Sequence, residues 1–446
     1  MNLSSLKYHL FLLSGIVLLL MACKKTETVV SYDVTDATVR SFALAANDSF
    51  PGLAAATFTV ENRTDTGMIA VANGDSMRYG TRLNAVVPRV QFNSRPAAAL
   101  YHVGDTVFTY SGYDTLDLTQ SPVYLHVFAA DRTHEKYYRI VAYAHQADPD
   151  QYTITPLNAQ FVAPCAMQVC YTGHYFHAFL SDGSTLRMTR STDAALWETA
   201  QTITGLPASC SVRQIVYDSL SGSFCYATGT QLYQSTDGVM WTAQTLPLTG
   251  SEVLSTLIAF DKHVWLLLRQ GEHMVLATWN PTDNEVQTVD SVPSSFPVSD
   301  FAPVHYLSSG GRQHALLYGG YDQRGTMLSD AWSVEALSDG MYRVMNVSQR
   351  NAQPMAGAAI VHYNGQLLRI GGLTETGDIA SVAYSVSEGM FWQAADTAHL
   401  PVPDGFLPRY RISADVVDNN IYLFGGQNHT QQFADCYRSR LNSIDW

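Results

Sequence analysis

Short runs of alternating apolar and polar residues follow one another along almost the whole chain. No long stretch shows the three- to four-residue spacing of an amphipathic helix. Turn-forming Gly, Asn, Asp and Pro separate the runs, which in the first third are Thr38–Leu44, Ala56–Val60, Val86–Phe92, Val123–Ala129 and Tyr137–Tyr143. Since side chains on a strand alternate between two faces, this pattern predicts strands joined by tight turns. The sequence therefore predicts an all-β protein.

The first block of predicted strands covers residues 32–147. Roughly seven to nine strands in such a length is the size of a β-sandwich. Its last two runs, Val127–Thr133 and Tyr137–Val141, resemble a hairpin of Bacteroidetes surface lipoproteins, where an Ala-x-Asp-x-Thr turn joins the final strands of an immunoglobulin-like module. This resemblance implies an immunoglobulin-like β-sandwich. The polar, Pro-containing segment Ala147–Asp150 then predicts a domain boundary.

A longer period appears in the last third of the chain. Three apolar runs end in Gly-Gly pairs that begin at residues 319, 371 and 425, so successive pairs are 52 and 54 residues apart. Aromatic residues follow each pair at similar distances: first Trp332, Tyr384 and Tyr437, then Tyr342, Trp392 and Trp446. This layout resembles the kelch repeat, in which each repeat forms one four-stranded blade of a β-propeller.

The earlier repeats carry a different mark at the turn between their last two strands. Ser191–Trp197 and Ser235–Trp241 resemble the Asp-box, whose pattern is Ser/Thr-x-Asp-x-Gly-x-x-Trp, and Ser385–Trp392 is a degenerate copy. In that motif the Asp accepts backbone hydrogen bonds in the turn and the Trp packs between blades. The motif is therefore structural and implies no hydrolase activity.

The spacing of these marks predicts six blades over residues 152–446. The expected inner strands lie near 163–172, 212–218, 254–261, 300–307, 355–363 and 410–418. How the ring closes stays open, because Gln151–Thr155 can supply a further strand to the last blade. The fold class expected is thus a six-bladed β-propeller preceded by an immunoglobulin-like β-sandwich.

The first 23 residues predict an export signal rather than part of the fold. Lys7 precedes an apolar stretch, Leu10–Leu20, that is too short to span a bilayer comfortably. The closing Leu-Met-Ala-Cys resembles the lipobox of bacterial lipoproteins, which implies acylation of Cys23 and a tether over residues 24–31. Lys24 in place of Asp implies retention at the outer membrane. The alternative is a plain secretory peptide with an accidental cysteine.

The amino-acid composition disfavours some classes of binding partner. The formal charge of −13 and the absence of a Lys/Arg run disfavour nucleic acid. Five cysteines follow Cys23 without the spacing of a zinc site, and most are expected to be buried. An export compartment also permits a Cys165–Cys170 or Cys210–Cys225 disulfide.

Ligands of propellers usually meet the loops around one mouth of the central channel. Here those loops precede each inner strand and follow each Gly-Gly pair. Arg409, Tyr410 and Arg411 are expected to bind there, since two arginines can hold a carboxylate through paired hydrogen bonds. Asp322 and Arg324 are further candidates. If Arg409–Arg411 is a strand, alternate side chains face opposite sides and only some of them reach the channel.

The sequence also allows an enzyme. Asp-boxes are typical of sialidases, and kelch propellers include sialic-acid epimerases and galactose oxidase. The Arg-Ile-Pro segment of sialidases is absent, and no spacing selects an acid–base pair from His305, His314, His362 and Glu375. No metal site or cofactor is predicted, and no catalytic residue is singled out. The favoured function is a cell-envelope binding module for a glycan, peptide or protein; the alternative is a carbohydrate-active enzyme such as a sugar epimerase or lyase.

Overall fold

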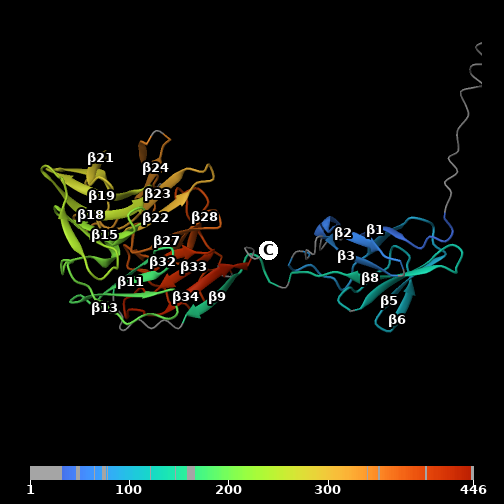
Figure 1. Cartoon of the computed structure of the whole chain (residues 1–446). Helices are drawn as coiled ribbons and strands as arrows, with labels where there is room; N and C mark the ends of the chain where they lie inside the picture. The colour runs from blue at the N-terminus through green and yellow to red at the C-terminus, as the bar shows by residue number, and fades with distance from the viewer. Residues whose placement is uncertain are drawn as a thin grey trace, which may run out of the picture. The chain divides into compact units, whose positions relative to one another are not determined.

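The structure is a computed structural model that describes residues 33–46, 51–64, 66–72, 77, 79–120, 122–145, 147–157, 166–338, 340–349, 352–396 and 399–442. The predicted export signal and tether, with Cys23, lie outside these ranges, as do Cys165 and Trp446. The chain forms two compact units that divide between Asp148 and Pro149. Figure 1 labels their strands, and each unit is described by itself.

The N-terminal unit is a β domain with one apolar core. Its elements are β1 (Val39–Leu44), η1 (Pro51–Ala55), β2 (Phe58–Asn62), β3 (Thr66–Val71), β4 (Pro88–Phe92), β5 (Ala98–Val103), β6 (Thr106–Thr109), β7 (Val123–Phe128) and β8 (Glu135–Val141). Six strands form a sheet in the order β2-β3-β8-β7-β5-β6, and β1 pairs with β4 in a second sheet. Both sheets contribute to a single buried cluster that includes Phe42, Leu125 and Tyr138.

The hairpin at the end of this domain forms where the sequence predicts it. Strands β7 and β8 pair antiparallel, with Phe128 opposite Glu135. The carboxylate of Asp131 accepts hydrogen bonds from the backbone of Thr133 and His134 at 3.0 and 3.1 Å and so holds the turn. The immunoglobulin-like topology itself stays a prediction, because the structure distributes the strands as six and two.

The C-terminal unit is built from four-stranded antiparallel sheets. The first three contain β10 (Ala166–Tyr171), β11 (Phe176–Ser181), β12 (Leu186–Ser191) and β13 (Gln201–Thr202); β14 (Val216–Asp218), β15 (Ser223–Thr228), β16 (Gln231–Ser235) and β17 (Thr242–Thr245); and β18 (Ser251–Phe260), β19 (His263–Gln270), β20 (His273–Asn280) and β21 (Glu285–Val292). The next three contain β22 (Ala302–Leu307), β23 (Gln313–Tyr318), β24 (Ala331–Ala336) and β25 (Tyr342–Asn346); β27 (Ala359–Tyr363), β28 (Gln366–Ile370), β30 (Ala383–Ser385) and β31 (Gln393–Ala394); and β32 (Ser413–Val417), β33 (Asn420–Phe424), β34 (Cys436–Leu441) and β9 (Tyr152–Leu157). A short pair, β26 (Met355–Ala356) with β29 (Leu373–Thr374), and the 3-10 turn η3 (Val212–Gln214) complete the unit.

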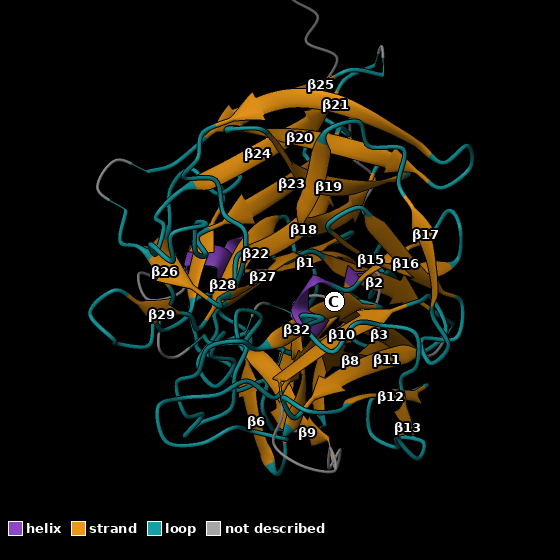
Figure 2. Cartoon of the chain, turned by 90° about the vertical axis from the view of Figure 1, so that its left-hand side faces the viewer, coloured by secondary structure: helices purple, strands orange, loops and turns teal. Residues whose placement is uncertain are grey.

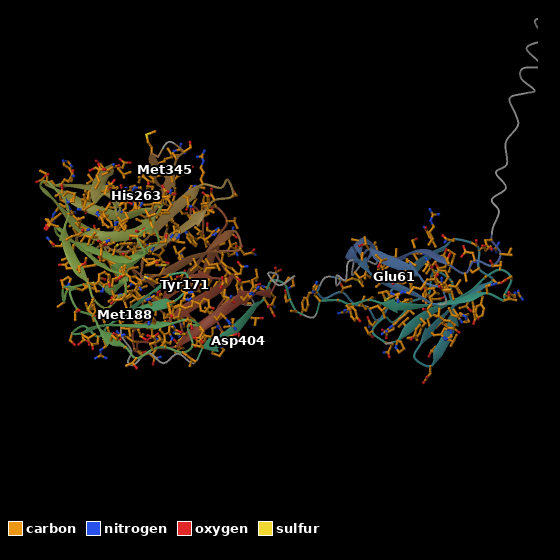
Figure 3. The ribbon with its side chains drawn as sticks, in the orientation of Figure 1. Glu61, Tyr171, Met188, His263, Met345 and Asp404 are labelled. Carbon is orange, nitrogen blue, oxygen red and sulfur yellow. The ribbon has the colours of Figure 1, made fainter. Side chains whose placement is uncertain are left out.

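These six sheets are the blades of a β-propeller, which we number one to six from β10 onward. The inner strands contact one another in a closed ring, β10-β14-β18-β22-β27-β32 and back to β10. Figure 2 shows β18, β22, β27 and β32 toward the middle, with β21, β25 and β17 at the rim. The predicted six-bladed propeller is confirmed within the described residues. The side chain of Met345 on β25 projects from the rim, whereas Tyr171 ends the inner strand β10 (Figure 3).

Strand β9 closes the ring. It precedes the first blade in the sequence but pairs antiparallel with β34, the third strand of blade six, and becomes the outer strand of that blade. The open question of closure is thereby answered: the beginning and the end of the unit share one sheet.

Apolar side chains pack between neighbouring blades. Trp241 of blade two packs edge-to-face on Phe179 of blade one, and Trp197 of blade one lies against Phe424 of blade six. The turns that precede these tryptophans are held by Asp193 and Asp237, which accept backbone hydrogen bonds of 2.8–2.9 Å. Turn and tryptophan therefore act in packing, as the sequence motif predicts.

Four cysteines, Cys170, Cys210, Cys225 and Cys436, are free and buried among the described residues. A Cys210–Cys225 disulfide is thus not formed, and both thiols pack as small apolar groups. In the described part of the chain, no helix is long and apolar enough to cross a membrane.

Candidate functional site

The loops that enter the inner strands of blades four, five and six share an unusual backbone conformation. Asp300, Gly357 and Arg411 each lie two residues before their strand, and all have positive φ, at 48°, 66° and 57°. The Gly357 amide donates to the Asp300 carbonyl at 2.7 Å, and the Arg411 amide donates to the Gly357 carbonyl at 2.6 Å. Left-handed φ is costly for residues other than glycine and is concentrated at functional sites. This chain of amides defines one mouth of the channel.

An ionic cluster of two arginines and one aspartate spans this mouth. The guanidinium of Arg411 donates to both carboxylate oxygens of Asp300 at 2.5–3.1 Å. Arg213, in η3 before blade two, places Nε 3.4 Å from the same carboxylate. Blades two, four and six are not neighbours in the ring, so these side chains meet across the mouth. A further contact across the mouth comes from Gln214, whose side-chain amide donates a hydrogen bond to the carbonyl of Val298 at 2.8 Å.

The cluster is only partly shielded from solvent. The side chains of Arg213 and Asp300 are 13% and 12% exposed, and that of Arg411 is 39% exposed. Burial lowers the pKa of Arg213, while the hydrogen bonds to Asp300 raise that of Arg411. Nε and Nη1 of Arg213 are buried without a hydrogen-bond acceptor among the described residues. Such unmet donors are expensive, so an acceptor that reached them would be stabilised.

Two half-buried tyrosines flank the cluster. Tyr321 follows the Gly-Gly pair of blade four, and Tyr410 immediately precedes Arg411. The hydroxyl of Tyr410 accepts a hydrogen bond from Nε2 of Gln427 at 2.8 Å. Burial, followed by the charge of Asp300, raises the pKa of Tyr321 although Arg411 opposes this. The mouth thus combines cationic donors with neutral aromatic and amide groups.

Arg409 does not share this position, although it is only two residues from Arg411. Its side chain is 3% exposed and donates to Asp435 at 2.6 Å and to the carbonyl of Gly425 at 3.2 Å. The guanidinium lies between the rings of Phe406 and Phe433, at 4.1 and 3.6 Å from their centroids. The alternation expected for a strand fails here, because the backbone bends at Arg411, whose φ is 57°, and β32 begins only at Ser413. We therefore leave Arg409 out of the proposed site.

Asp322 and Arg324 lie in the loop that follows Tyr321. Asp322 is buried, and its carboxylate accepts the backbone amides of Arg324 and Thr326 at 2.9 and 2.8 Å. These contacts give Asp322 a turn-forming role. The side chain of Arg324 is exposed and stands outside the ionic cluster.

Sequence reasoning singled out Arg411 and Tyr410 but missed Arg213 and Asp300. The missing signal was the register of the repeats. Once the inner strands are aligned, Asp300 and Arg411 occupy the same place in blades four and six, two residues before the strand. Arg213 stands three residues before β14 in blade two. Equivalent loop positions of alternate blades face one another across the axis.

The histidines considered for catalysis lie away from the mouth. His314 and His362 both stack on Tyr306, with ring centroids 5.6 and 5.1 Å from it. Tyr306 is near the end of β22 opposite to Asp300. Burial lowers the pKa of His362, as it does that of His305 on the same strand as Tyr306. No group of three or more metal-ligating side chains forms among the described residues.

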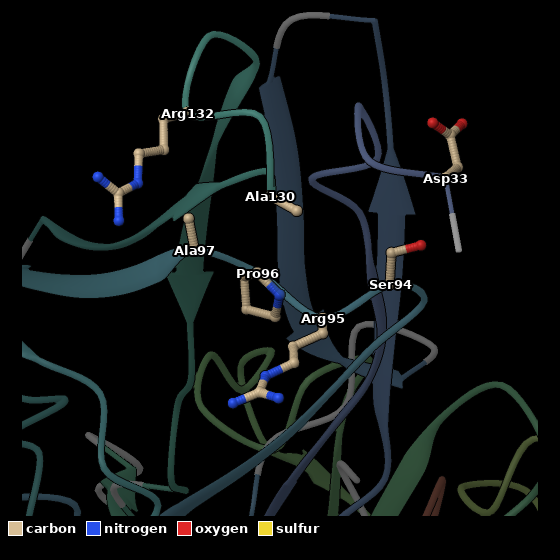
Figure 4. Close-up of a pocket in the computed structure, with 7 residues that line it drawn as sticks. All are labelled: Asp33, Ser94, Arg95, Pro96, Ala97, Ala130 and Arg132. Carbon is tan, nitrogen blue, oxygen red and sulfur yellow. The ribbon is translucent and has the colours of Figure 1, made fainter. Parts of the chain in front are cut away.

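A cavity of about 550 Å³ lies in the N-terminal domain, lined by Asp33, Ser94, Arg95, Pro96, Ala97, Ala130 and Arg132. Figure 4 shows that its charged side chains, Asp33, Arg95 and Arg132, point in different directions rather than toward a common point. Because binding sites need convergent polar groups, the propeller mouth is the better candidate.

Fold and site together define a two-domain all-β protein with a C-terminal β-propeller. The comparison with known families agrees: residues 150–446 match the DUF6242 beta propeller domain, and residues 24–141 match the N-terminal domain of DUF6242, a domain of unknown function. The chain belongs to the DUF6242 family.

No curated protein matches the chain in sequence. Among the solved structures that match is one titled "Structure of YjhT", with a TM-score of 0.46 and 10% identity over 63% of this chain and 95% of that chain. At this level the likeness carries no functional information.

Proposed function

We propose that the protein is a cell-envelope lipoprotein that binds a ligand through the mouth of its propeller. The observation that carries the proposal is the convergence of Arg213, Asp300 and Arg411 from three alternate blades. Each side chain stands on a loop held by a rigid ring of blades, which suits recognition because the donors are fixed before the ligand arrives. The kelch and Asp-box character of the repeats is part of the same proposal.

The groups at the mouth favour binding over catalysis. An epimerase or lyase needs an acid and a base that exchange protons with the substrate near neutral pH. The carboxylate of Asp300 is engaged by two guanidinium groups. The nearby hydroxyl of Tyr321 has a raised pKa, mainly because it is buried, so it stays protonated at pH 7 and supplies no base. A binding module needs only the fixed donors and ring faces that are present.

The experiment is a glycan and peptide array probed with the chain from residue 24 onward. Arg411→Met removes the donor that is most exposed in the cluster and keeps much of its length, so we expect it to abolish the array signal. Arg324→Met is the matched control, since Arg324 lies on a nearby loop outside the cluster. A signal that survives Arg411→Met and Arg213→Met in folded protein would overturn the assignment of the site.

A further inference from the structure

The ionic cluster at the mouth contains two positive charges and one negative charge. Two guanidinium groups, of Arg213 and Arg411, share the single carboxylate of Asp300. The sharing is unequal. Arg411 makes three hydrogen bonds to Asp300, whereas Arg213 approaches one oxygen to 3.4 Å without forming one. The mouth therefore holds an arginine whose charge and donors are incompletely satisfied.

The position of Asp300 shows what shape of group fits between the arginines. A planar carboxylate already lies there, in contact with guanidinium groups from blades two and six. Paired N–H donors of arginine match the two oxygens of a carboxylate in one plane. Asp300 is also held in a left-handed conformation, with φ of 48°, which an aspartate adopts at a cost. The carboxylate of Asp300 thus occupies a position between two guanidinium groups that another carboxylate would fit.

The rim around this site is polar and aromatic. It contains the phenol groups of Tyr321 and Tyr410, the amide of Gln427, and the imidazole of His429, whose ring centroid is 6.3 Å from that of Tyr410. Hydroxyl and amide groups exchange hydrogen bonds with sugar hydroxyls, and aromatic faces pack on the C–H face of a sugar ring.

We propose that the mouth binds the carboxylate of an acidic sugar, which takes the place of Asp300 between the guanidinium groups of Arg213 and Arg411. This inference rests on the proposed function of the mouth as a binding site and adds the class of ligand. Asp300 acts as a built-in competitor: it pairs the arginines when the site is empty and is displaced when the sugar carboxylate arrives. The incoming carboxylate then lies between the two guanidinium groups, where it reaches the donors of Arg213 that Asp300 leaves unmet.

The test compares glucuronate with glucose by calorimetry on the chain from residue 24 onward. The wild-type chain should bind glucuronate and not glucose. Asp300→Asn removes the competing charge and keeps the shape, and asparagine tolerates the left-handed conformation. We expect this variant to bind glucuronate about tenfold more tightly, the change typical of one charge-assisted hydrogen bond. Arg213→Met and Arg411→Met should each lose binding, and Arg324→Met should leave it unchanged.

The outcomes separate this inference from the broader function. If Asp300→Asn folds, as judged by circular dichroism, and binds glucuronate no more tightly, the displacement of Asp300 is refuted. Array ligands that still depend on Arg411 would then leave the mouth as a binding site. If a dipeptide with a free carboxyl end binds as tightly as glucuronate, the sugar class is wrong. If the Arg411→Met chain binds every array ligand as the wild type does, the proposed function fails as well.

Discussion

Glycine at the ends of the second strands meets two demands at once. Gly371 has φ of 67°, and a Cβ atom there would lie 2.0 Å from the carbonyl oxygen of Arg409. Gly319 and Gly425 occupy the same place in blades four and six, also with positive φ. Backbone conformation and close approach therefore both require glycine, and the approach brings the loop of Arg409 and Tyr410 against the neighbouring blade.

We expect Gly371→Ala to lower the free energy of unfolding by about 2–4 kcal/mol, since it adds both backbone strain and a clash with a carbonyl. Gly377→Ala is the control: its φ is 87°, but nothing lies within 4 Å of the added methyl group. The control should cost only about 1 kcal/mol. Urea unfolding measures both values, and equal costs would contradict the role of close approach.

The buried carboxyl group of Asp415, on β32, should make the stability of the protein depend on pH. Burial raises its pKa from 3.8 to about 6, although the amides of Tyr171 and Val416 donate to the carboxylate. Between these two pKa values the folded chain binds more protons at this site than the unfolded chain does. The free energy of unfolding should therefore fall by roughly 1–3 kcal/mol as the pH rises from about 4 to about 6.

The measurement is urea unfolding at several pH values on wild type and Asp415→Asn. The variant cannot ionise, so its stability should lack this decrease, and above about pH 6 it should be the more stable protein. Parallel curves for the two proteins between these pH values would show that Asp415 is not the group responsible.

At the scale of single elements, the short strand β9 matters most, because it closes the ring of blades. Among the described strands it pairs with β34 alone, so alternate amides point toward that strand or away from it. The amide of Asn442 donates to the carbonyl of Gln151, and Pro156, which has no amide hydrogen, stands opposite Tyr437. Both facts place the amide of Thr155 toward β34 and that of Ile154 away from it.

Thr155→Pro should therefore break a hydrogen bond that closes the ring, and we expect it to lower the free energy of unfolding by about 1–3 kcal/mol. Ile154→Pro loses no such bond and should cost less. Thermal unfolding of the two full-length variants makes the comparison. A larger loss for Ile154→Pro would mean that side-chain packing, rather than the hydrogen bonds of β9, closes the propeller.

At the scale of the whole molecule, we propose that the predicted export signal holds the two folded units at a membrane by the N-terminus. Cys23→Ser removes the sulfur that would carry a diacylglycerol group, and stable anchoring depends on such chains. We expect the wild type to sediment with the outer-membrane fraction and the variant to move to the soluble envelope fraction. Membrane association that survives Cys23→Ser would contradict the lipoprotein assignment.

Much of the architecture can be read from local sequence because its causes are local. Alternation of apolar side chains follows from the two faces of a strand, and the Gly-Gly pairs follow from backbone positions that reject a Cβ atom. Five of the six inner strands lie within the ranges expected from the repeats, as β22 (Ala302–Leu307) does within 300–307, and β18 (Ser251–Phe260) overlaps its expected range of 254–261. The number of blades could therefore be predicted from the spacing of the Gly-Gly pairs and the Asp-box-like turns.

The site could be predicted only in part because its causes are not local. Arg409 and Arg411 look equivalent in sequence, yet one is packed between Phe406 and Phe433 and the other pairs with Asp300, 111 residues away. Which of them faces the channel depends on where the turn before β32 places each side chain. If this segment is taken as a strand, Arg409 and Arg411 face the same side, so the sequence alone does not distinguish them.

The succession of strands, the left-handed backbone at the Gly-Gly pairs and the turn-forming aspartates are written in the chain, since each depends on neighbours a few residues apart. The pairing of β9 with β34 and the meeting of Arg213, Asp300 and Arg411 came only from the closed ring. A ring brings equivalent loops of distant repeats to one axis, and no short window of sequence contains that distance.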